Sequence, residues 1–510
     1  MKKVALVLFL LFAQVAFSRT IWIATVSDTQ GQLEPYSSGG KSVGGFARVA
    51  HIIKELKKEH PSRVLFVSTG DDLMGEYFLK FGGKAIYSVF SRMGVDAVTL
   101  GNHEFDRGVK TLEGALRFAR FPVVVSNISC DEGVALCGML RKYLVLDVGG
   151  VKIGVIGLIT PELARISRAS GVKVDADMAR IADELGRRLK EEKGADIVVA
   201  LTHIGLAQDR RLAASTGYID VICGGHSHDL LREPVVVKNR LGRDVVIVQD
   251  GVRALYVGVL RLDVEGGEVR DFDWRLVPVD SSCPEDWSVK TLVSLFKKGL
   301  PPSRTLAKVE GRLDLRSAFL RTHEAPVGDM ITDAVRERFG VDVAFINSGG
   351  IRGDRVIEGV ITSRDVASMF PFGNTVVLVE ATGGVIKAML EHGLEAYPEP
   401  SGAFLQFSGI RVKVDPSRPP GKRVLSVEVF RRGWVELKKD ATYTIAVNSY
   451  MAGGGDGYTM LMGLNGTDTY VSYRSVFEQW LSSEGVVRPR TDGRLEFVGD
   501  LKIAFQNLFW

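Results

Sequence analysis

Asp96-Ala97-Val98-Thr99-Leu100-Gly101-Asn102-His103-Glu104-Phe105-Asp106 is the stretch that decides the fold of this chain. Its apolar run stops at Gly101, and an amide, an imidazole and two carboxylates follow. This order predicts a buried strand that ends in an exposed polar turn. Ligands of open α/β sheets bind outside the carboxyl ends of the strands, so this turn is a candidate site.

Four other apolar runs end in polar turns of the same kind. Because each donor falls directly after a predicted strand, the five turns are expected to meet at one rim of the sheet. Carboxylates, imidazoles and an amide, with no thiolate, suit a borderline-hard divalent ion such as Zn, Mn, Fe, Co or Ni. Donors from five turns exceed the needs of one ion, so two ions about 3.5–4 Å apart are expected. The donors on the other four turns are Asp28, Asp71, His203 and the pair His226 and His228.

The chain is too long for a single core, since it has 510 residues. Strands alternate with helices over 19–280, which predicts a layered α/β domain that includes a short strand at 123–125. Prolines bound the segment 281–303, which predicts a linker helix. A second α/β unit is expected over 304–510.

Residues 1–18 have the pattern of a secretory signal peptide, with a basic start, an apolar centre and a small-x-small end. The sequence therefore predicts export to the periplasm or the exterior, and no later apolar run is long enough to predict a membrane span in the mature protein. Lys and Arg total 65 against 61 Asp and Glu, so no nucleic-acid polymer is expected as a partner. The oligomeric state does not follow from the sequence.

The chain has four cysteines and no CxxC pair, which argues against a thiolate zinc site. Cys130 and Cys137 lie seven positions apart and can pair in an oxidising compartment. Cys223 follows a strand-like run and is expected to be a buried thiol, and Cys283 falls in the linker.

The second half carries its own group of aromatic, arginine and acidic side chains on glycine-rich turns. Two aromatic rings on such turns can hold a flat ring between them, and arginines can hold a phosphate by paired hydrogen bonds. The alternative is that the glycines serve tight turns and the rings pack locally. The candidate substrate residues are Arg321, Asn347, Arg352, Phe372, Tyr450 and Asp456.

Taken together, these motifs resemble those of the calcineurin-like metallophosphoesterases. Their order and spacing most resemble the secreted 5′-nucleotidase family, which includes UDP-sugar hydrolases and 2′,3′-cyclic-nucleotide phosphodiesterases. The resemblance implies an N-terminal αββα sandwich and a C-terminal α/β nucleotide-binding domain. The motifs that carry it are Asp28-Thr29-Gln30, Gly70-Asp71, Gly101-Asn102-His103-Glu104, Thr202-His203 and Gly224-Gly225-His226-Ser227-His228.

The resemblance also implies which residues bind each metal, with Asp71 shared between the two ions. One ion would be bound by Asp28, Asp71 and His228. The other would be bound by Asp71, Asn102, His203 and His226.

His103 would face the phosphate rather than bind a metal, and Asp106 would orient its imidazole and raise its pKa. The alternative is that His103 is a further ligand. No chemical role for Glu104 follows from the sequence.

The resemblance assigns a role to each candidate substrate residue. The two rings, Phe372 and Tyr450, would stack on the base. Asp456 would bind the ribose, and Asn347 the base or the sugar. Arg321 and Arg352 would meet the phosphate or the sugar region.

Gln30 departs from the family pattern, which usually has Asp-x-His where this chain has Asp28-Thr29-Gln30. An amide oxygen is a weaker donor than an imidazole, so Gln30 is an uncertain ligand that can bind weakly, act through water or not bind at all. The metal on the Asp28 side is therefore expected to bind more weakly or to differ in identity. His228 supplies an imidazole that can offset the change.

The expected function is hydrolysis of nucleotides at two divalent ions, by attack of metal-bound hydroxide on phosphorus. A UDP-sugar hydrolase or a 2′,3′-cyclic-nucleotide phosphodiesterase remains an alternative on the same scaffold. A thiosulfohydrolase-like enzyme is a second alternative, although it would leave the two aromatic rings without a purpose. A nucleotide-binding protein with an impaired metal site is the non-enzymatic alternative.

Overall fold

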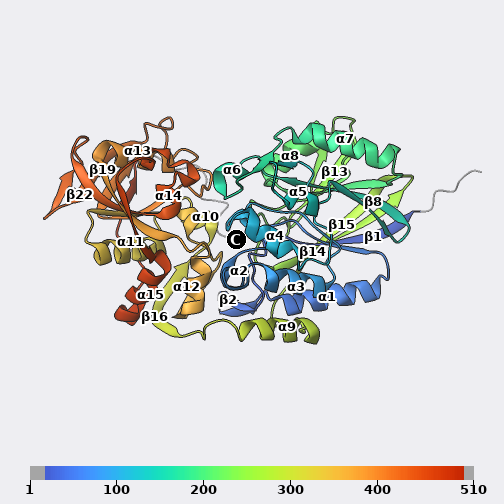
Figure 1. Ribbon diagram of the computed structural model, residues 1–510, viewed down its shortest axis with the longest axis horizontal. Coiled ribbons are helices and arrows are strands. Elements are labelled where there is room, and N and C mark those ends of the chain that lie inside the picture. The colour runs from blue at the N-terminus through green and yellow to red at the C-terminus, as the bar shows by residue number, and fades with distance from the viewer. Residues whose placement is uncertain (1–17, 39, 499–510) are drawn as a thin grey trace, which may run out of the picture.

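The computed structural model describes residues 18–38 and 40–498, so the predicted signal peptide lies, except for its last residue, outside the described part. Two bodies lie side by side along the long axis of the molecule, the N-terminal one mostly blue to green and the C-terminal one yellow to red (Figure 1). Helix α9 (Trp287–Lys297) runs along the first body, and the chain then crosses to the second. Within the described ranges, no helix combines the length and the apolar character needed to cross a membrane.

The first body is built on two sheets. The five-stranded sheet has the order β15-β14-β1-β4-β5, in which β1, β4 and β5 are parallel. The six-stranded sheet has the order β12-β13-β11-β10-β8-β7, in which β8, β10, β11 and β13 are parallel. The strands are β1 (Arg19–Val26), β4 (Val64–Ser68), β5 (Ala97–Val98), β7 (Tyr143–Val148), β8 (Val151–Ile159), β10 (Ile197–His203), β11 (Val221–Cys223), β12 (Val235–Lys238), β13 (Asp244–Val248), β14 (Tyr256–Glu265) and β15 (Glu268–Pro278).

The two sheets pack face to face, and helices cover both outer faces. Buried side chains such as Ile23 and Val199 fill the space between the sheets. Helices α1 and α3 pack on the five-stranded sheet, and α7 and α8 on the six-stranded one. This layering confirms the expected αββα sandwich. The helices are α1 (Phe46–Glu59), α2 (Gly75–Phe81), α3 (Lys84–Met93), α4 (Val109–Leu116), α7 (Met178–Glu191) and α8 (Leu206–Ser215).

The second body is centred on a sheet of order β20-β17-β24-β19-β25. Helices α11 and α15 contribute to the core on one side, and α13 with strands β21 and β22 to the core on the other. A mixed α/β body results, as expected. Its main elements are β16 (Thr305–Asp314), α11 (Pro326–Phe339), β17 (Val343–Asn347), β18 (Val356–Thr362), α12 (Ser363–Met369), β19 (Thr375–Thr382), α13 (Gly383–Gly393), β20 (Leu405–Ser408), β21 (Ile410–Val414), β22 (Val424–Phe430), β23 (Trp434–Glu436), β24 (Thr442–Asn448), β25 (Gly466–Ser472), α15 (Tyr473–Glu484), β26 (Val486–Val487) and β27 (Leu495–Phe497).

The prediction of a strand at 123–125 is wrong. Val123 makes an isolated bridge to Val98, and Val124 makes one to Arg141. Because these two bridges lead to different partners, no ladder forms. The regular strand lies further on, at β6 (Ile128–Cys130), where it pairs with β9 (Val172–Val174).

Cys130 and Cys137 form a disulfide. It closes the segment that leads from β6 into the short helix α5 (Leu136–Met139). Cys223 is a buried free thiol, as expected, and Cys283 is a partly exposed free thiol.

Candidate active site

The five polar turns predicted from the sequence follow or complete strands β1, β4, β5, β10 and β11, and they meet at one rim. The first two turns are hydrogen-bonded to each other. The Asp28 amide donates to the Gly70 carbonyl at 3.0 Å, and the Gln30 amide donates to the Asp71 carbonyl at 2.9 Å. These bonds bring the turn after β1 against the turn after β4.

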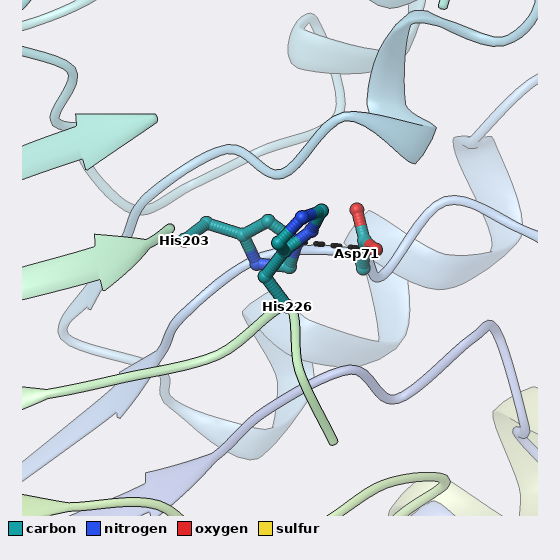
Figure 2. A group of neighbouring side chains, drawn as sticks. All are labelled: Asp71, His203 and His226. Carbon is teal, nitrogen blue, oxygen red and sulfur yellow. Dashed lines mark ion pairs between the residues drawn. The ribbon is translucent and has the colours of Figure 1, made fainter. Parts of the chain in front are cut away.

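Asp71, His203 and His226 form the centre of the site. Their ligand atoms all lie within 4.8 Å of one another, and Figure 2 shows the three side chains pointing toward a common point. His203 Nε2 lies 3.1 Å from Asp71 Oδ2. The rings of His203 and His226 are 5.0 Å apart in an edge-to-face arrangement.

Asp28 and His228 extend this centre on one side. Asp28 Oδ1 lies 3.5 Å from His228 Nε2 and 3.9 Å from His203 Nε2. The His226 amide donates to the Asp28 carboxylate, at 3.1 Å to Oδ2. The predicted carboxylate and imidazole donors therefore lie together.

The donor atoms are disposed as a cation requires. His203 Nδ1 lies 2.8 Å from the Thr69 carbonyl, which can only accept, so Nδ1 carries the proton. The Nε2 lone pair then faces the Asp71 carboxylate, and this contact is favourable only with a second proton or a metal between them. Without a metal, burial would lower the pKa of His203, but the Asp71 carboxylate outweighs burial and raises that pKa to about 10. Asn102 Oδ1 is also buried, with no hydrogen-bond partner among the described residues.

Backbone strain is concentrated at the same positions. Asp28, Asp71, His226 and His228 have φ angles of 46°, 56°, 83° and 61°, and Gln30 has 51°. Residues other than glycine rarely adopt a positive φ, because this conformation costs about 1–3 kcal/mol per residue. The fold holds these residues in unfavourable conformations that aim their side chains at one point, which supports a functional role for the cluster.

The electrostatic environment also fits cation binding. Burial alone would raise the pKa of Asp71, but the imidazoles of His103 and His203 hold it well below the usual range. Burial and the neighbouring His203 lower the pKa of His226 to about 3, so its imidazole is neutral and free to bind a metal. Burial raises the pKa of Asp28, a penalty that a bound cation would offset.

Glu104, to which the sequence assigned no chemistry, joins two of the turns. Its carboxylate accepts hydrogen bonds from the amides of Asp71 at 3.0 Å and Gly101 at 2.6 Å. It also accepts from the amides of Asp72 at 2.7 Å and Leu73 at 2.9 Å. A Cβ atom at Gly101 would collide with Asp71 Oδ1, so this close approach requires glycine.

His103 lies between its predicted partner and a residue of the second body. Its Nδ1 is 2.8 Å from Asp106 Oδ2, and Arg352 Nη2 donates to its Nε2 at 2.7 Å. A guanidinium can only donate, so in this arrangement Nε2 accepts and Nδ1–H donates to Asp106. Burial lowers the pKa of His103, but the carboxylates of Asp106 and Asp71 outweigh it and raise the pKa overall.

A cavity of about 340 Å³ lies between the two bodies. The first body lines it with Asp71, Asn102, His103, Asp106, His226 and His228. The second body lines it with all six candidate substrate residues, Arg321, Asn347, Arg352, Phe372, Tyr450 and Asp456.

Hydrogen bonds and ring contacts fix the positions of the candidate substrate residues. Tyr450 Oη donates to Asp456 Oδ1 at 2.9 Å, and Asn347 Nδ2 donates to Asp456 Oδ2 at 2.7 Å. Phe372 lies 5.4 Å from the His103 ring at an interplanar angle of 26°. The Arg352 guanidinium lies 5.3 Å from the centre of the Phe372 ring.

Two features in or beside this cavity were missed by sequence reasoning. Asp354 Oδ2 lies 3.5 Å from His228 Nδ1, so a carboxylate of the second body touches a candidate ligand of the first. The segment of α6 (Leu163–Ile166) and the residues after it supply part of the cavity wall. The only local signal for the first feature was Asp354 itself, an acidic residue after Arg352-Gly353. It does not reveal that its partner, His228, lies 126 positions earlier.

Comparison with known proteins agrees with this geometry. Residues 21–230 match the calcineurin-like phosphoesterase family, and residues 305–463 match the 5′-nucleotidase C-terminal domain. The snake venom 5′-nucleotidase of Gloydius brevicauda is 31% identical over 93% of this chain and 87% of that protein. The human 5′-nucleotidase is 30% identical over 93% of this chain and 91% of that protein.

A solved structure shows the same architecture over nearly the whole chain. The crystal structure of a 5′-nucleotidase precursor from Thermus thermophilus has a TM-score of 0.89 and 33% identity, covering 94% of this chain and 100% of that one. One chain therefore carries the phosphoesterase sandwich, the acidic and histidine-rich rim, and the second body that closes over that rim. This chain belongs to the 5′-nucleotidase family of metal-dependent phosphoric ester hydrolases.

Proposed function

We propose that the protein is an exported nucleotidase that removes phosphate from nucleotides with the help of two divalent ions. One observation carries the proposal. A single cavity is lined by carboxylate, imidazole and amide side chains of the first body and by aromatic and arginine residues of the second. A substrate with a flat base at one end and a phosphate at the other fits that arrangement.

The metal assignment follows the family resemblance, and the donor geometry supports it. His228 lies 3.5 Å from Asp28, and His203 lies 3.1 Å from Asp71. We assign Asp28, Asp71 and His228 to one ion, and Asp71, Asn102, His203 and His226 to the other. Bound divalent ions would polarise a phosphoryl oxygen and lower the pKa of water.

His103 would meet the charge that develops on the phosphoryl or leaving oxygen. In this structure its Nε2 accepts from Arg352. An incoming phosphate would attract the Arg352 guanidinium to its own oxygens, which frees Nε2 to take up a proton. Asp106 and Asp71 raise the pKa of His103 and so favour the cation.

Substrate selection would rest on the second body. Phe372 and Tyr450 would stack on the base, while Arg321 and Arg352 would hold the phosphate or sugar region. Asp456 holds Tyr450 and Asn347 in place here, and would exchange these contacts for the ribose hydroxyls.

We also propose that the chain divides into a phosphoesterase domain at 19–280, a linker at 281–303 and a substrate domain at 304–510. The apolar cores support the boundary at 303, because Leu300 packs in a core of the first body and Leu306 in a core of the second. Export is supported by the disulfide, which persists in oxidising compartments, and by the similarity to a venom protein.

The test is a hydrolysis panel with varied divalent ions. We expect phosphate release from 5′-AMP or ATP, less from UDP-glucose and 2′,3′-cyclic AMP, and none after chelation of divalent ions. Preferential cleavage of one of the latter two would favour the corresponding alternative enzyme. Tight AMP binding without turnover, with Mn or Co supplied, would favour a binding protein and contradict the proposal.

The stacking role has a separate test. Tyr450→Ala should raise KM for nucleotides by about tenfold or more, since stacking on a base contributes about 1–3 kcal/mol. KM for p-nitrophenyl phosphate should change far less. Tyr470→Ala is the matched control, because Tyr470 is 86% exposed. Equal losses on both substrates would argue against stacking.

A further inference from the structure

A second cavity, of about 330 Å³, lies where the two bodies meet, and it shares no lining residue with the first. Gln30 and Gln32 line it, which places it beside the turn that carries Asp28. It is lined from the first body by Arg253 and from the second by Arg355. None of the proposed catalytic steps uses these two residues.

Arg253 and Arg355 are both buried, with 3% and 4% of their surfaces exposed. Both guanidinium groups lie over the ring of Tyr36, at 4.6 Å and 5.4 Å from its centre. Burial and the neighbouring Arg253 lower the pKa of Arg355, so the two cations repel each other. The Nε atoms of both residues are buried and find no hydrogen-bond partner within the described ranges.

The carboxylates of this cavity, Asp365, Glu34 and Glu76, are already engaged, and Glu76 pairs with Arg364 at 3.4 Å. Asp365 accepts from Arg355 at 2.7 Å. Glu34 accepts from Arg364 at 2.9 Å and pairs with Lys297. Arg253 donates to the Gln32 side chain, and among the described residues it has no ion pair with a carboxylate. It is therefore a buried cation without a counter-ion in that part of the chain.

A buried charge without a partner is costly, and an anion in the cavity would remove that cost. The guanidinium fork matches the spacing of oxygens in a tetrahedral oxyanion. We propose that this cavity is a second anion site, which binds one inorganic phosphate or a similar small oxyanion between Arg253 and Arg355. Because the two arginines belong to different bodies, the bound anion would also favour the arrangement in which the bodies meet.

Equilibrium dialysis of the metal-loaded protein with radiolabelled inorganic phosphate tests the site. The wild type should bind one more phosphate per chain than Arg253→Met, or bind the second phosphate at least tenfold more tightly. Phosphate held at the rim of the first cavity contributes equally to both proteins, so the comparison does not depend on the proposed function. Hydrolysis of p-nitrophenyl phosphate should be unchanged in Arg253→Met.

Lys297→Met is the matched control, because it removes a cation from the same cavity without touching the arginine pair. It should bind phosphate like the wild type. If Arg253→Met does not fold, Arg253→Lys keeps the charge but loses the fork, and should weaken the second phosphate about tenfold. Equal binding by the wild type and the Arg253 variants would overturn the proposal, and so would an equal loss in Lys297→Met.

Discussion

Gln30 is the residue at which the metal rim differs from the family pattern. Its side chain is 6% exposed, and its Nε2 lies 3.4 Å from His228 Nε2. Rotation of the amide by half a turn would present its oxygen instead, so the side chain can still reach a cation. The imidazole at this end of the site comes from His228.

We expect Gln30→His to increase the affinity for the ion proposed on the Asp28 side by on the order of tenfold, because imidazole is a better donor than an amide. Metal content by mass spectrometry after dialysis measures this directly. Gln32→His, on the same turn, should change nothing at the metal. Unchanged occupancy in Gln30→His would contradict the expected weakness of that side.

Asp329 is a second informative residue, far from the metal rim. It is 3% exposed, and its oxygens find no hydrogen-bond partner in the part of the chain that the structure describes. Arg494 Nε is 3.5 Å away, but that guanidinium binds Asp333 at 3.0 Å and Asp492 at 2.8 Å. Burial raises the pKa of Asp329 to about 9.

A carboxyl with a raised pKa binds its proton more tightly in the folded state than in the unfolded state. The free energy of unfolding therefore falls as pH rises from about 4, the ordinary pKa of an aspartate, to about 9. Asp329→Asn removes the penalty and should stabilise the protein at pH 8 by about 1–3 kcal/mol, with little effect near pH 4. Thermal unfolding at both pH values measures this.

Asp333→Asn is the contrasting variant, because Asp333 makes a direct bond to Arg494. It should lower the unfolding midpoint at pH 8. A lower midpoint for Asp329→Asn at pH 8 would show that its carboxylate is stabilising, contrary to the raised pKa.

At the scale of elements, the site depends on turns being held against one another. Glu104 lies in the short helix η1 (His103–Phe105) and accepts four backbone hydrogen bonds from the turns after β4 and β5. Neither strand alone fixes the distance between Asp71 and Asn102. Glu104 does so by binding amides on both turns.

Glu104→Gln should therefore destabilise the protein by about 2–4 kcal/mol, since the amide nitrogen cannot accept and would face buried N–H groups. Metal binding should weaken as well, because the turns lose their common anchor. Urea unfolding and metal content measure the two effects. Glu113→Gln is the control: Glu113 accepts from one amide, that of Leu136, which a glutamine oxygen can also do. Equal losses in both variants would exclude the anchoring role.

At the scale of the whole molecule, Glu34 joins the two bodies and the linker. It accepts from Tyr77 at 2.9 Å within the first body and from Arg364 at 2.9 Å in the second. It also pairs with Lys297 of α9. This partly buried carboxylate therefore helps to hold the bodies together, beside the contacts of Arg352 with His103 and of Asp354 with His228.

Glu34→Gln should weaken this joint by about 1–2 kcal/mol, since charge-assisted bonds become neutral ones. We expect the bodies to separate more often, and the radius of gyration from small-angle X-ray scattering to rise. Glu310→Gln removes exposed ion pairs within the second body and should leave the radius unchanged. An unchanged radius for Glu34→Gln at low and high salt would show that the other contacts between the bodies are enough to hold them together.

Much of the first body could be predicted from the sequence, because strand ends are local features. The apolar run before Asn102 and the one before His203 each mark a buried strand, and the next polar residues must fall at the sheet rim. The prediction of a strand at 123–125 was wrong because strand pairing depends on distant partners. Val123 and Val124 bridge to two different partners, so no ladder forms there. The residues alone left the pairing of Cys130 with Cys137 open, because spacing permits a bond but does not require one.

What the sequence by itself determined is the set of donor types and the rim on which they lie, because side chains that directly follow a strand share the position of its end. Only the tertiary structure decided which atoms meet across long separations. Arg352 donates to His103 from 249 positions away, and Asp354 reaches His228 from the other body. Those contacts depend on how two separately packed cores are oriented against each other, which no local pattern of residues encodes.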